Sequence, residues 1–233
     1  MQLLVDETNR YYQQYLEKFD EGPSPKPDVT MTEMYLLLAI ILQMGHDVRD
    51  SLRDYWSTLH QFNTPFYSST IRRDRFLHIL RFLHFSDNSK EPNKDDEDYD
   101  RLWKIRALFD MLNDSYAKFY FPSEHLAVDE VIVLFKGRVV FRQYIPKKHK
   151  RFGIKVYKLC DDRAYTYDMK VYLGKDRLNL AKETPATQAT VRSLTRRVEG
   201  VGHKLYMDNF FSSPNLFDEL KTKKYLLLWH SQT

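Results

Sequence analysis

A change of hydrophobic period part-way along the chain constrains its fold more than any other feature of the sequence. In "RRDRFLHILRFLHF", Phe76, Ile79, Leu80 and Leu83 fall on one face at helical spacing. Later segments such as "HLAVDEVIVLF" are short apolar runs typical of strands, separated by helical patterns. We therefore expect an all-helical N-terminal region, residues 1–122, followed by a mixed α/β region with a sheet and flanking helices, residues 123–233.

The helical region contains two breaker segments and ends in a candidate core helix. "EGPSPKPD" has three prolines and predicts a linker, and "SDNSKEPNKDDEDYD" predicts an exposed loop. The last helix ends before Pro122. Its apolar stripe is expected to face the core and consists of Leu102, Ile105, Leu108, Leu112 and Phe119.

The second region predicts a definite strand order. "LAVDEVIVLF" is the first strand, "KGR" a tight turn, "VVFRQYI" a return strand and "GIKVYKLC" a third strand. A helix, a strand ending at Asp208, a second helix and the strand "KYLLLW" follow, which gives the order β-β-β-α-β-α-β. If three antiparallel strands precede a helix and a parallel fourth strand, the first and fourth strands are neighbours. Asp129 and Asp208 should then lie close together.

Two carboxylates, Asp129 and Glu130, interrupt the apolar first strand. An unpaired buried carboxylate costs several kcal/mol or takes up a proton, so a cation or a site is expected there. Mg²⁺ is commonly held by one or two carboxylates with water and substrate phosphate, so Asp129 and Asp208 are candidate metal ligands. The alternative is structural: Asp129 faces water, and Asp208 caps the turn in "MDNFFSSP".

The charge distribution suggests a nucleic-acid surface. The net charge is +4, but residues 136–204 hold 18 Lys and Arg against 6 Asp and Glu, a difference of +12. A solvated sheet face would also explain this block. The best phosphate contacts are Lys147, Lys148, Lys150 and Arg151, to which we add Lys155, Arg192 and Arg196. One cysteine excludes an internal disulfide framework, and no apolar run reaches membrane-spanning length.

Several longer motifs resemble the piggyBac family of DNA transposases. They cover nearly the whole chain: "MTEMYLLLAIILQMG", "DYWS", "RRDRFLHILRFLHFSDN", "HLAVDEVIVLFKGR", "QYIPKKHKRFGIKVYKLCDD", "YLGK" and "HKLYMDNFFSSPNLFDEL". The resemblance implies an RNase H-like (DDE) catalytic domain in residues 123–233. It also implies a helical dimerisation and DNA-binding region in residues 1–122, and Mg²⁺-dependent cutting and joining of DNA in the nucleus.

By position, Asp129 and Asp208 match the family's first two catalytic aspartates. We expect no match to the third, because the chain departs from the family pattern in "KYLLLWHSQT". The expected function is therefore that of a transposase relative with impaired catalysis. Its expected partners are DNA and either a second copy or a related full-length transposase, with no membrane. The alternatives are a non-catalytic DNA- or chromatin-binding module and a fragment without independent function.

Overall fold

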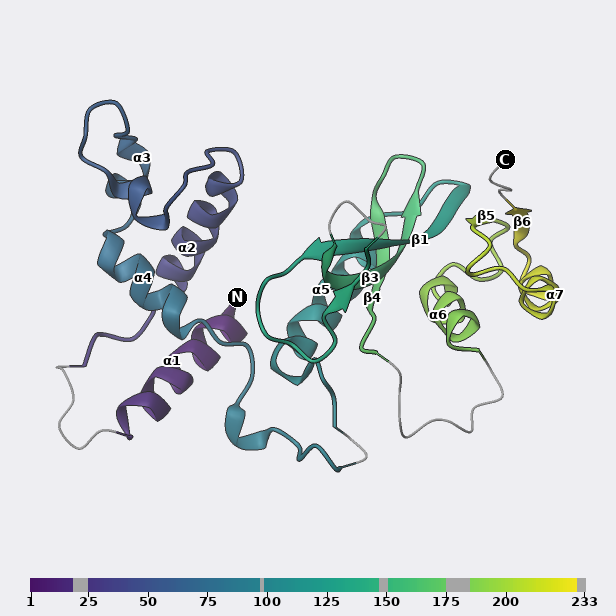
Figure 1. Ribbon diagram of the computed structural model, residues 1–233, viewed down its shortest axis with the longest axis horizontal. Coiled ribbons are helices and arrows are strands. Elements are labelled where there is room, and N and C mark those ends of the chain that lie inside the picture. Colours follow the sequence, from purple (N-terminus) through teal and green to yellow (C-terminus); the bar gives the residue numbers. More distant parts are fainter. Residues whose placement is uncertain (19–24, 97–98, 147–150, 175–184, 230–233) are drawn as a thin grey trace. The chain divides into compact units, whose positions relative to one another are not determined.

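The chain forms two compact units in a computed structural model, Met1–Leu108 and Phe109–Thr233. The structure describes residues 1–18, 25–96, 99–146, 151–174 and 185–229 (Figure 1). The boundary lies earlier than residue 122, inside the last helix expected for the N-terminal region. The assignment of dimerisation and catalysis to separate regions stays a prediction.

The first unit is helical, as expected. Its main helices and 3₁₀ turns are α1 (Gln2–Leu16), α2 (Met31–Met44), η1 (Leu52–Trp56), α3 (Pro65–Thr70), α4 (Arg73–Phe82), η2 (Asn88–Lys90) and η3 (Trp103–Ile105). α2 begins at Thr30, whose hydroxyl accepts from the Glu33 amide while the Glu33 carboxylate accepts from the Thr30 amide. This reciprocal cap supplies partners for amides that the first helical turn leaves unpaired.

The core of the first unit is closed by α2 and α4. Met34, Leu37 and Ile40 of α2 and Phe76 and Ile79 of α4 are fully buried. Their spacing on each helix is the apolar stripe that amphipathic helices bury against one another. The apolar face expected in this segment is confirmed, because Leu80 and Leu83 are also partly buried against the same core.

The second unit contains most of α5 and a mixed sheet with two crossover helices. Its elements are α5 (Arg106–Phe119), β1 (His125–Leu134), β2 (Gln143–Tyr144), β3 (Phe152–Asp161), β4 (Thr166–Val171), α6 (Ala186–Thr195), β5 (Lys204–Met207), α7 (Pro214–Thr222) and β6 (Leu226–Trp229). The strand order is β2-β3-β1-β5-β6, with β4 also paired to β3. β1 and β3 are antiparallel, whereas β1, β5 and β6 are parallel. This is the expected RNase H-like arrangement.

The return strand expected at "VVFRQYI" is wrong. Only Gln143 and Tyr144 of this segment are in a strand, and they pair with β3 rather than with β1. β1 has no free edge for a return strand, because β3 occupies one side and β5 the other. The antiparallel partner of β1 is β3, the segment "GIKVYKLC", and β4 is the third strand of the antiparallel part.

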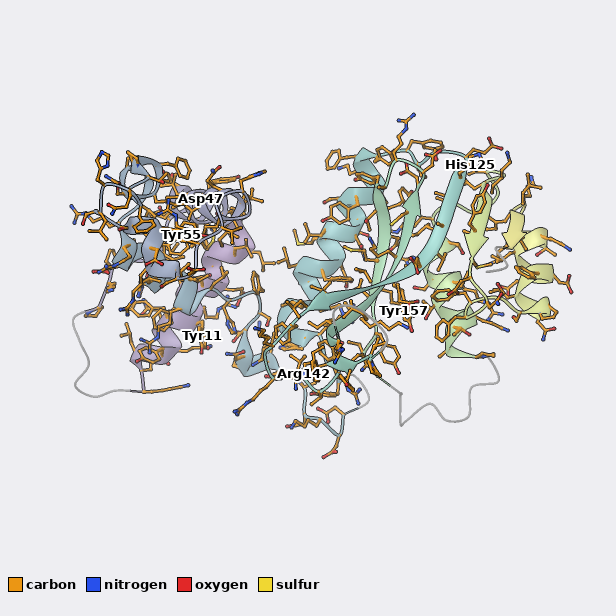
Figure 2. All side chains as sticks on the ribbon, turned by 45° about the horizontal axis from the view of Figure 1, so that its top comes forward. Tyr11, Asp47, Tyr55, His125, Arg142 and Tyr157 are labelled. Atoms are coloured by element: carbon orange, nitrogen blue, oxygen red, sulfur yellow. The ribbon has the colours of Figure 1, made fainter. Side chains whose placement is uncertain are left out.

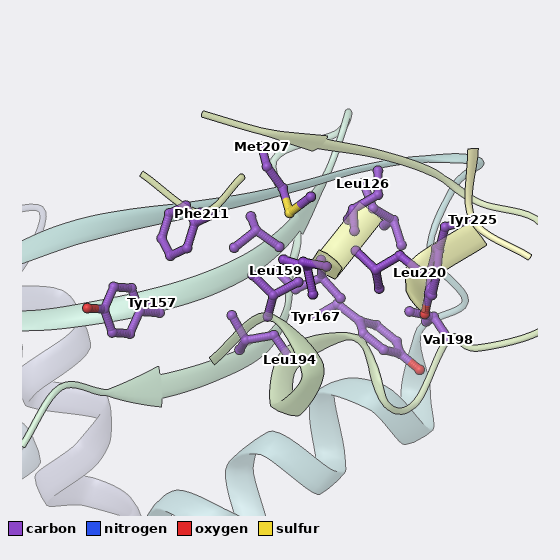
Figure 3. Close-up of a cluster of buried hydrophobic side chains, with 14 residues drawn as sticks. Leu126, Tyr157, Leu159, Tyr167, Leu194, Val198, Met207, Phe211, Leu220 and Tyr225 are labelled. Carbon is purple, nitrogen blue, oxygen red and sulfur yellow. The ribbon is translucent and has the colours of Figure 1, made fainter. Parts of the chain in front are cut away.

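One face of the sheet packs on the helices. Leu126 and Val128 of β1 and Leu205 and Met207 of β5 join a buried cluster with Leu194 of α6 (Figure 3). α7 adds Leu216 and Leu220, and the partly buried Ala117 of α5 and Tyr120, which follows α5, pack against the cluster. Alternate residues of β1 point to the other face, because successive strand residues do so.

The expected inward stripe holds at Leu102, which is 3% exposed, but is wrong at three of its other positions. Ile105, Leu112 and Phe119 are 38%, 41% and 78% exposed, while Asn113 is buried. The Asn113 side chain donates to the Met169 carbonyl at 2.8 Å and accepts from the Met169 amide at 3.2 Å. β4 has a free edge at this position, and Asn113 satisfies both backbone groups there. The helix therefore presents a polar side chain to the sheet edge.

No helix in the described part of the chain is long and apolar enough to cross a membrane.

Candidate metal site and DNA surface

The fold brings Asp129 and Asp208 to matching positions on adjacent strands. Val128 and Met207 are paired in the parallel β1–β5 register, and each aspartate is the next residue. Neighbouring strands lie about 4.8 Å apart. Both aspartates are exposed, and the preceding residue of each points into the core cluster. Alternation along β1 therefore puts the Asp129 carboxylate on the sheet face that points away from the helices, while Asp208 begins the turn that follows β5.

Each aspartate is fixed by backbone amides on one carboxylate oxygen. Asp129 Oδ1 accepts from the Glu130 amide at 2.7 Å. Asp208 Oδ1 accepts from the Phe210 amide at 3.0 Å and the Phe211 amide at 3.4 Å. Lys158 of β3 lies opposite Asp129 in the sheet, yet within the described residues neither aspartate forms an ion pair. Both features of the structural alternative are therefore present: Asp129 faces water, and Asp208 caps its turn.

The two carboxylates fit part of a divalent-metal site. Hard oxygen donors close together, each held by an amide and uncompensated by a described cation, suit Mg²⁺ with water and phosphate as further ligands. Among the described residues, however, no group of three or more His, Cys, Asp and Glu side chains could hold a metal. Asp129 and Asp208 alone would therefore give an incomplete coordination sphere.

Lys155 does not point toward the aspartates. It lies opposite Ile132 in the β1–β3 register, on the face of the sheet that the helices cover. Its ammonium is 3.9 Å from the Glu130 carboxylate, and both side chains are 14% exposed. This pair answers the question raised by two carboxylates in an apolar strand: Asp129 is exposed and Glu130 meets a cation. DNA contact by Lys155 stays a prediction, against which this burial argues.

Two further cations expected at DNA are already paired inside the unit. Arg192 binds Glu219 through Nε at 2.8 Å, and this contact lowers the pKa of the Glu219 carboxyl. Arg196 lies 3.5 Å from Asp168, which is 1% exposed. Burial raises the pKa of Asp168, while the charges of Arg196 and Arg197 oppose that rise. Since both arginines compensate carboxylates, we leave them out of the proposed DNA surface.

Three exposed cations of the second unit lie between β1 and β3. In this β1–β3 connection (residues 135–151), Lys136, Arg138 and Arg151 are exposed and form no ion pair with a described residue. Arg142 holds the connection together by donating to the carbonyls of Lys136 and Gly137, and Figure 2 shows it at the opposite end of the sheet from His125. Lys147, Lys148 and Lys150 lie outside the described residues.

Lys136 and Arg138 were missing from the residues expected to contact phosphate. They belong to the basic block that the sequence shows, but nothing in the sequence separates them from the cations that turn out to be paired.

A shallow hollow of about 320 Å³ lies at the start of β1, away from the two aspartates. It is lined by His125, Leu126, Ala127, Asp161, Asp162 and Tyr206. His125 Nδ1 is 2.8 Å from the Tyr206 hydroxyl, and Asp161 binds the Tyr120 hydroxyl and two backbone amides. These polar groups are satisfied within the fold, and the hollow does not include the metal-site candidates.

The sheet topology agrees with what comparisons with known proteins show. A family model described as Transposase IS4 matches residues 1–228. The chain belongs to the Transposase IS4 family. It is also similar to human piggyBac transposable element-derived protein 3, with 29% identity over 198 residues, which are 83% of this chain and 32% of that protein. Human piggyBac transposable element-derived protein 2 is 28% identical over 70% of this chain and 25% of its own length.

A solved structure shares the fold of this transposase relative. The structure of piggyBac transposase in a synaptic complex with hairpin DNA matches with a TM-score of 0.84 and 27% identity, over 98% of this chain and 47% of that one. These matches confirm the resemblance to piggyBac transposases and the RNase H-like fold. The chain spans about a third or less of the curated relatives and about half of the solved chain.

Proposed function

We propose that this chain is a DNA-engaging part of a piggyBac-type transposase that contributes two carboxylates to a divalent-metal site. The proposal rests on one observation: Asp129 and Asp208 each directly follow a member of the Val128–Met207 pair, which joins the parallel strands β1 and β5. Their separation along the chain is 79 residues, so only this topology makes them neighbours. The substrate would be the phosphodiester backbone of DNA.

The chain's own residues suit two tasks in such a site. Asp129 and Asp208 would hold Mg²⁺, and the amides of Glu130 and Phe210 keep the carboxylates oriented. When bound, Mg²⁺ would polarise a phosphoryl oxygen and lower the pKa of a coordinated water. Lys136, Arg138 and Arg151 would hold phosphates by charge without reading base sequence.

The catalytic activity of the whole relatives is not carried over to this chain. A two-ion site needs more fixed oxygen ligands than two aspartates provide, so we propose that the chain binds metal and DNA without cutting DNA by itself. A DNA substrate would place the protein in the nucleus. A second copy or a longer transposase is the protein partner that this function would require.

Metal titration tests the proposal directly. Binding of Mn²⁺ to the full chain would be followed by the loss of free-ion electron paramagnetic resonance signal. We expect Asp129→Asn and Asp208→Asn each to weaken binding by at least about tenfold, since each removes one anionic ligand. Asp162→Asn is the matched control, because Asp162 is exposed and lies in the hollow rather than beside the aspartates.

The outcomes separate the candidate functions. Weaker Mn²⁺ binding in both variants, with the control unchanged, supports the metal site. If both variants bind Mn²⁺ as the parent does, the metal site is wrong. Salt-dependent DNA binding that remains in that case would favour a non-catalytic DNA-binding module.

A further inference from the structure

Two aromatic residues, one exposed and one buried, stabilise the turn that carries Asp208. The amides of Phe210 and Phe211 donate to Asp208 Oδ1, and the Ser212 hydroxyl donates to the Asp208 carbonyl at 2.8 Å. Phe211 is 1% exposed and packs edge-on against Tyr157 at 5.7 Å. Phe210 is 51% exposed, so the core holds it less firmly than it holds Phe211.

Lys155 supplies the contact that the core does not give to Phe210. Its ammonium lies 4.7 Å from the centre of the Phe210 ring and 4.9 Å from that of Tyr157. A cation over an aromatic face is attracted by the ring quadrupole, and more strongly where water is excluded. With its side chain 14% exposed and Glu130 at 3.9 Å, Lys155 is held between two rings and one carboxylate.

These contacts connect the turn that carries Asp208 to the strand that carries Asp129. The Glu130 amide binds Asp129, and the Glu130 carboxylate meets Lys155. Lys155 meets the Phe210 ring, and the Phe210 amide binds Asp208. The residues whose amides orient the two carboxylates are therefore linked to each other through one ammonium group.

We propose that Lys155 is a positioning residue that fixes Asp208 relative to Asp129 through Phe210 and Glu130. This inference rests on the proposed metal site for its functional meaning, because a metal needs both carboxylates at a fixed separation. Misplacement of a reacting group by about 1 Å can cost on the order of a hundredfold in rate, so a contact behind the site can matter without touching the ligand. This positioning role differs from the DNA contact that the charge of Lys155 led us to expect.

Hydrogen exchange of individual amides tests the positioning role without any metal. Lys155→Met keeps an unbranched apolar side chain and removes the charge. We expect protection of the Phe210 amide to fall at least about fivefold, because local opening of the turn becomes easier, while amides in α7 keep theirs. Lys155→Arg, which retains a cation for both the ring and the carboxylate, should restore protection.

Two further variants separate positioning from general stability. Lys118→Met removes another cation–ring contact of the same unit, between Lys118 and Phe119 on α5, and should leave the Phe210 amide unchanged. Phe210→Leu removes the ring but keeps Lys155, and should loosen Asp208 as Lys155→Met does. Phe210→Leu also serves as the test if Lys155→Met does not fold.

Mn²⁺ binding then links the amide result to the site. We expect Lys155→Met to weaken Mn²⁺ binding by roughly threefold to tenfold and Lys155→Arg to bind nearly as the parent does. Unchanged Phe210 protection in a folded Lys155→Met protein, or no recovery with Lys155→Arg, would overturn the positioning role. If the parent itself binds no Mn²⁺, the proposed metal site fails, while the amide comparison still decides the role of Lys155.

Discussion

At the scale of single residues, burial and ion pairs shift the pKa values of two ionisable groups in the first unit, His78 and Glu33. His78 of α4 is 8% exposed, with the Tyr12 ring edge-on at 4.7 Å and Phe82 at 5.0 Å. Burial lowers the pKa of His78 to about 4, and the nearby charges act in both directions. Those that lower it are Lys26, Arg75 and Arg81, and Glu33 opposes them.

This pKa predicts acid sensitivity of the first unit. The unfolded chain takes up a proton at His78 near pH 6.5, but the folded chain does so only near pH 4. Stability from this group is therefore complete above pH 6.5 and declines as the pH falls to about 4, by up to about 3 kcal/mol. We expect His78→Phe to flatten the free energy of unfolding across this window in urea titrations. The exposed His60→Phe control should retain the slope, and an unchanged slope in His78→Phe would contradict the prediction.

A second residue-scale prediction concerns Glu33. Arg75 binds its carboxylate through Nε at 2.7 Å and Nη2 at 2.9 Å, and this contact lowers the pKa of Glu33 to about 2. Because the folded pKa lies below the unfolded one, stability is present above about pH 4.5 and is lost as the pH falls toward 2.

Glu33→Gln keeps a side chain that can cap α2 but removes the charge. We expect it to lower the free energy of unfolding by about 1–2 kcal/mol at pH 7, and by less at pH 3. Urea titrations at both pH values measure the difference. Asp74→Asn is the control, since the Asp74 side chain is 77% exposed beside Arg73. An equal loss at both pH values would mean that the charge is not the cause.

At the scale of elements, α5 attaches to the sheet through its buried Asn113. The side chain satisfies the amide and carbonyl of Met169 on the free edge of β4. We expect Asn113→Ala to cost about 1–3 kcal/mol, because the Met169 carbonyl loses its side-chain donor and the Met169 amide keeps only Asp168 Oδ1 as a side-chain acceptor. It should also raise self-association, since an uncovered edge strand can pair with another chain. Chemical denaturation and light scattering measure these effects.

Ser115→Ala is the matched control on the same helix, because the Ser115 hydroxyl bonds only within α5, to the Met111 carbonyl. If Asn113→Ala unfolds like this control and stays monomeric, the bond to β4 is not what fastens α5.

The elements that sequence patterns predicted well are those with local signals. The start of α7 has such a signal, since the Ser213 side chain caps the helix and Pro214 occupies its first turn. The helix expected between the antiparallel strands and β5 implied a parallel crossover that made β1 and β5 neighbours. The return strand at "VVFRQYI" failed because alternation does not reveal which strand edges remain free. The stripe on α5 failed because Asn113 is buried by a partner on β4 that only the tertiary structure supplies.

Sequence patterns had the same limit at the candidate metal site, because they do not reveal tertiary partners. Asp129 and Asp208 could be predicted as neighbours, since strand order alone places them so. The role of Lys155 could not, because Glu130 and Phe210 reach it from other strands and turns. A positive charge in the sequence has the same appearance whether it meets a phosphate or a carboxylate.

At the scale of the whole molecule, the proposed DNA surface predicts a particular salt dependence. Each phosphate contact releases counterions, so log K falls with log salt by about 0.9 per contact. Replacing Lys136, Arg138 and Arg151 together by Ala should flatten the slope by up to about 2.7 units. Fluorescence anisotropy with duplex DNA from low to moderate salt measures it.

The control replaces three exposed lysines elsewhere in the same unit, Lys118, Lys221 and Lys224, by Ala. Both triple variants lower the net charge equally, so a general charge effect would flatten both slopes alike. If the control variant flattens the slope of log K against log salt as much as the test variant does, DNA does not bind specifically at the β1–β3 connection.

The last prediction concerns chemistry: this chain should not nick DNA with Mg²⁺ or Mn²⁺. Two bound ions carry about four positive charges and must leave positions open for the attacking and leaving oxygens. Asp129 and Asp208 provide two negative charges, and no third acidic or histidine ligand joins them among the described residues. Mg²⁺ also demands near-octahedral geometry and gives up water reluctantly, so a second ion would be poorly held. Supercoiled plasmid incubated with either metal measures nicking, with Asp129→Asn beside the parent. Nicking by the parent that disappears in Asp129→Asn would show that a further group completes the site.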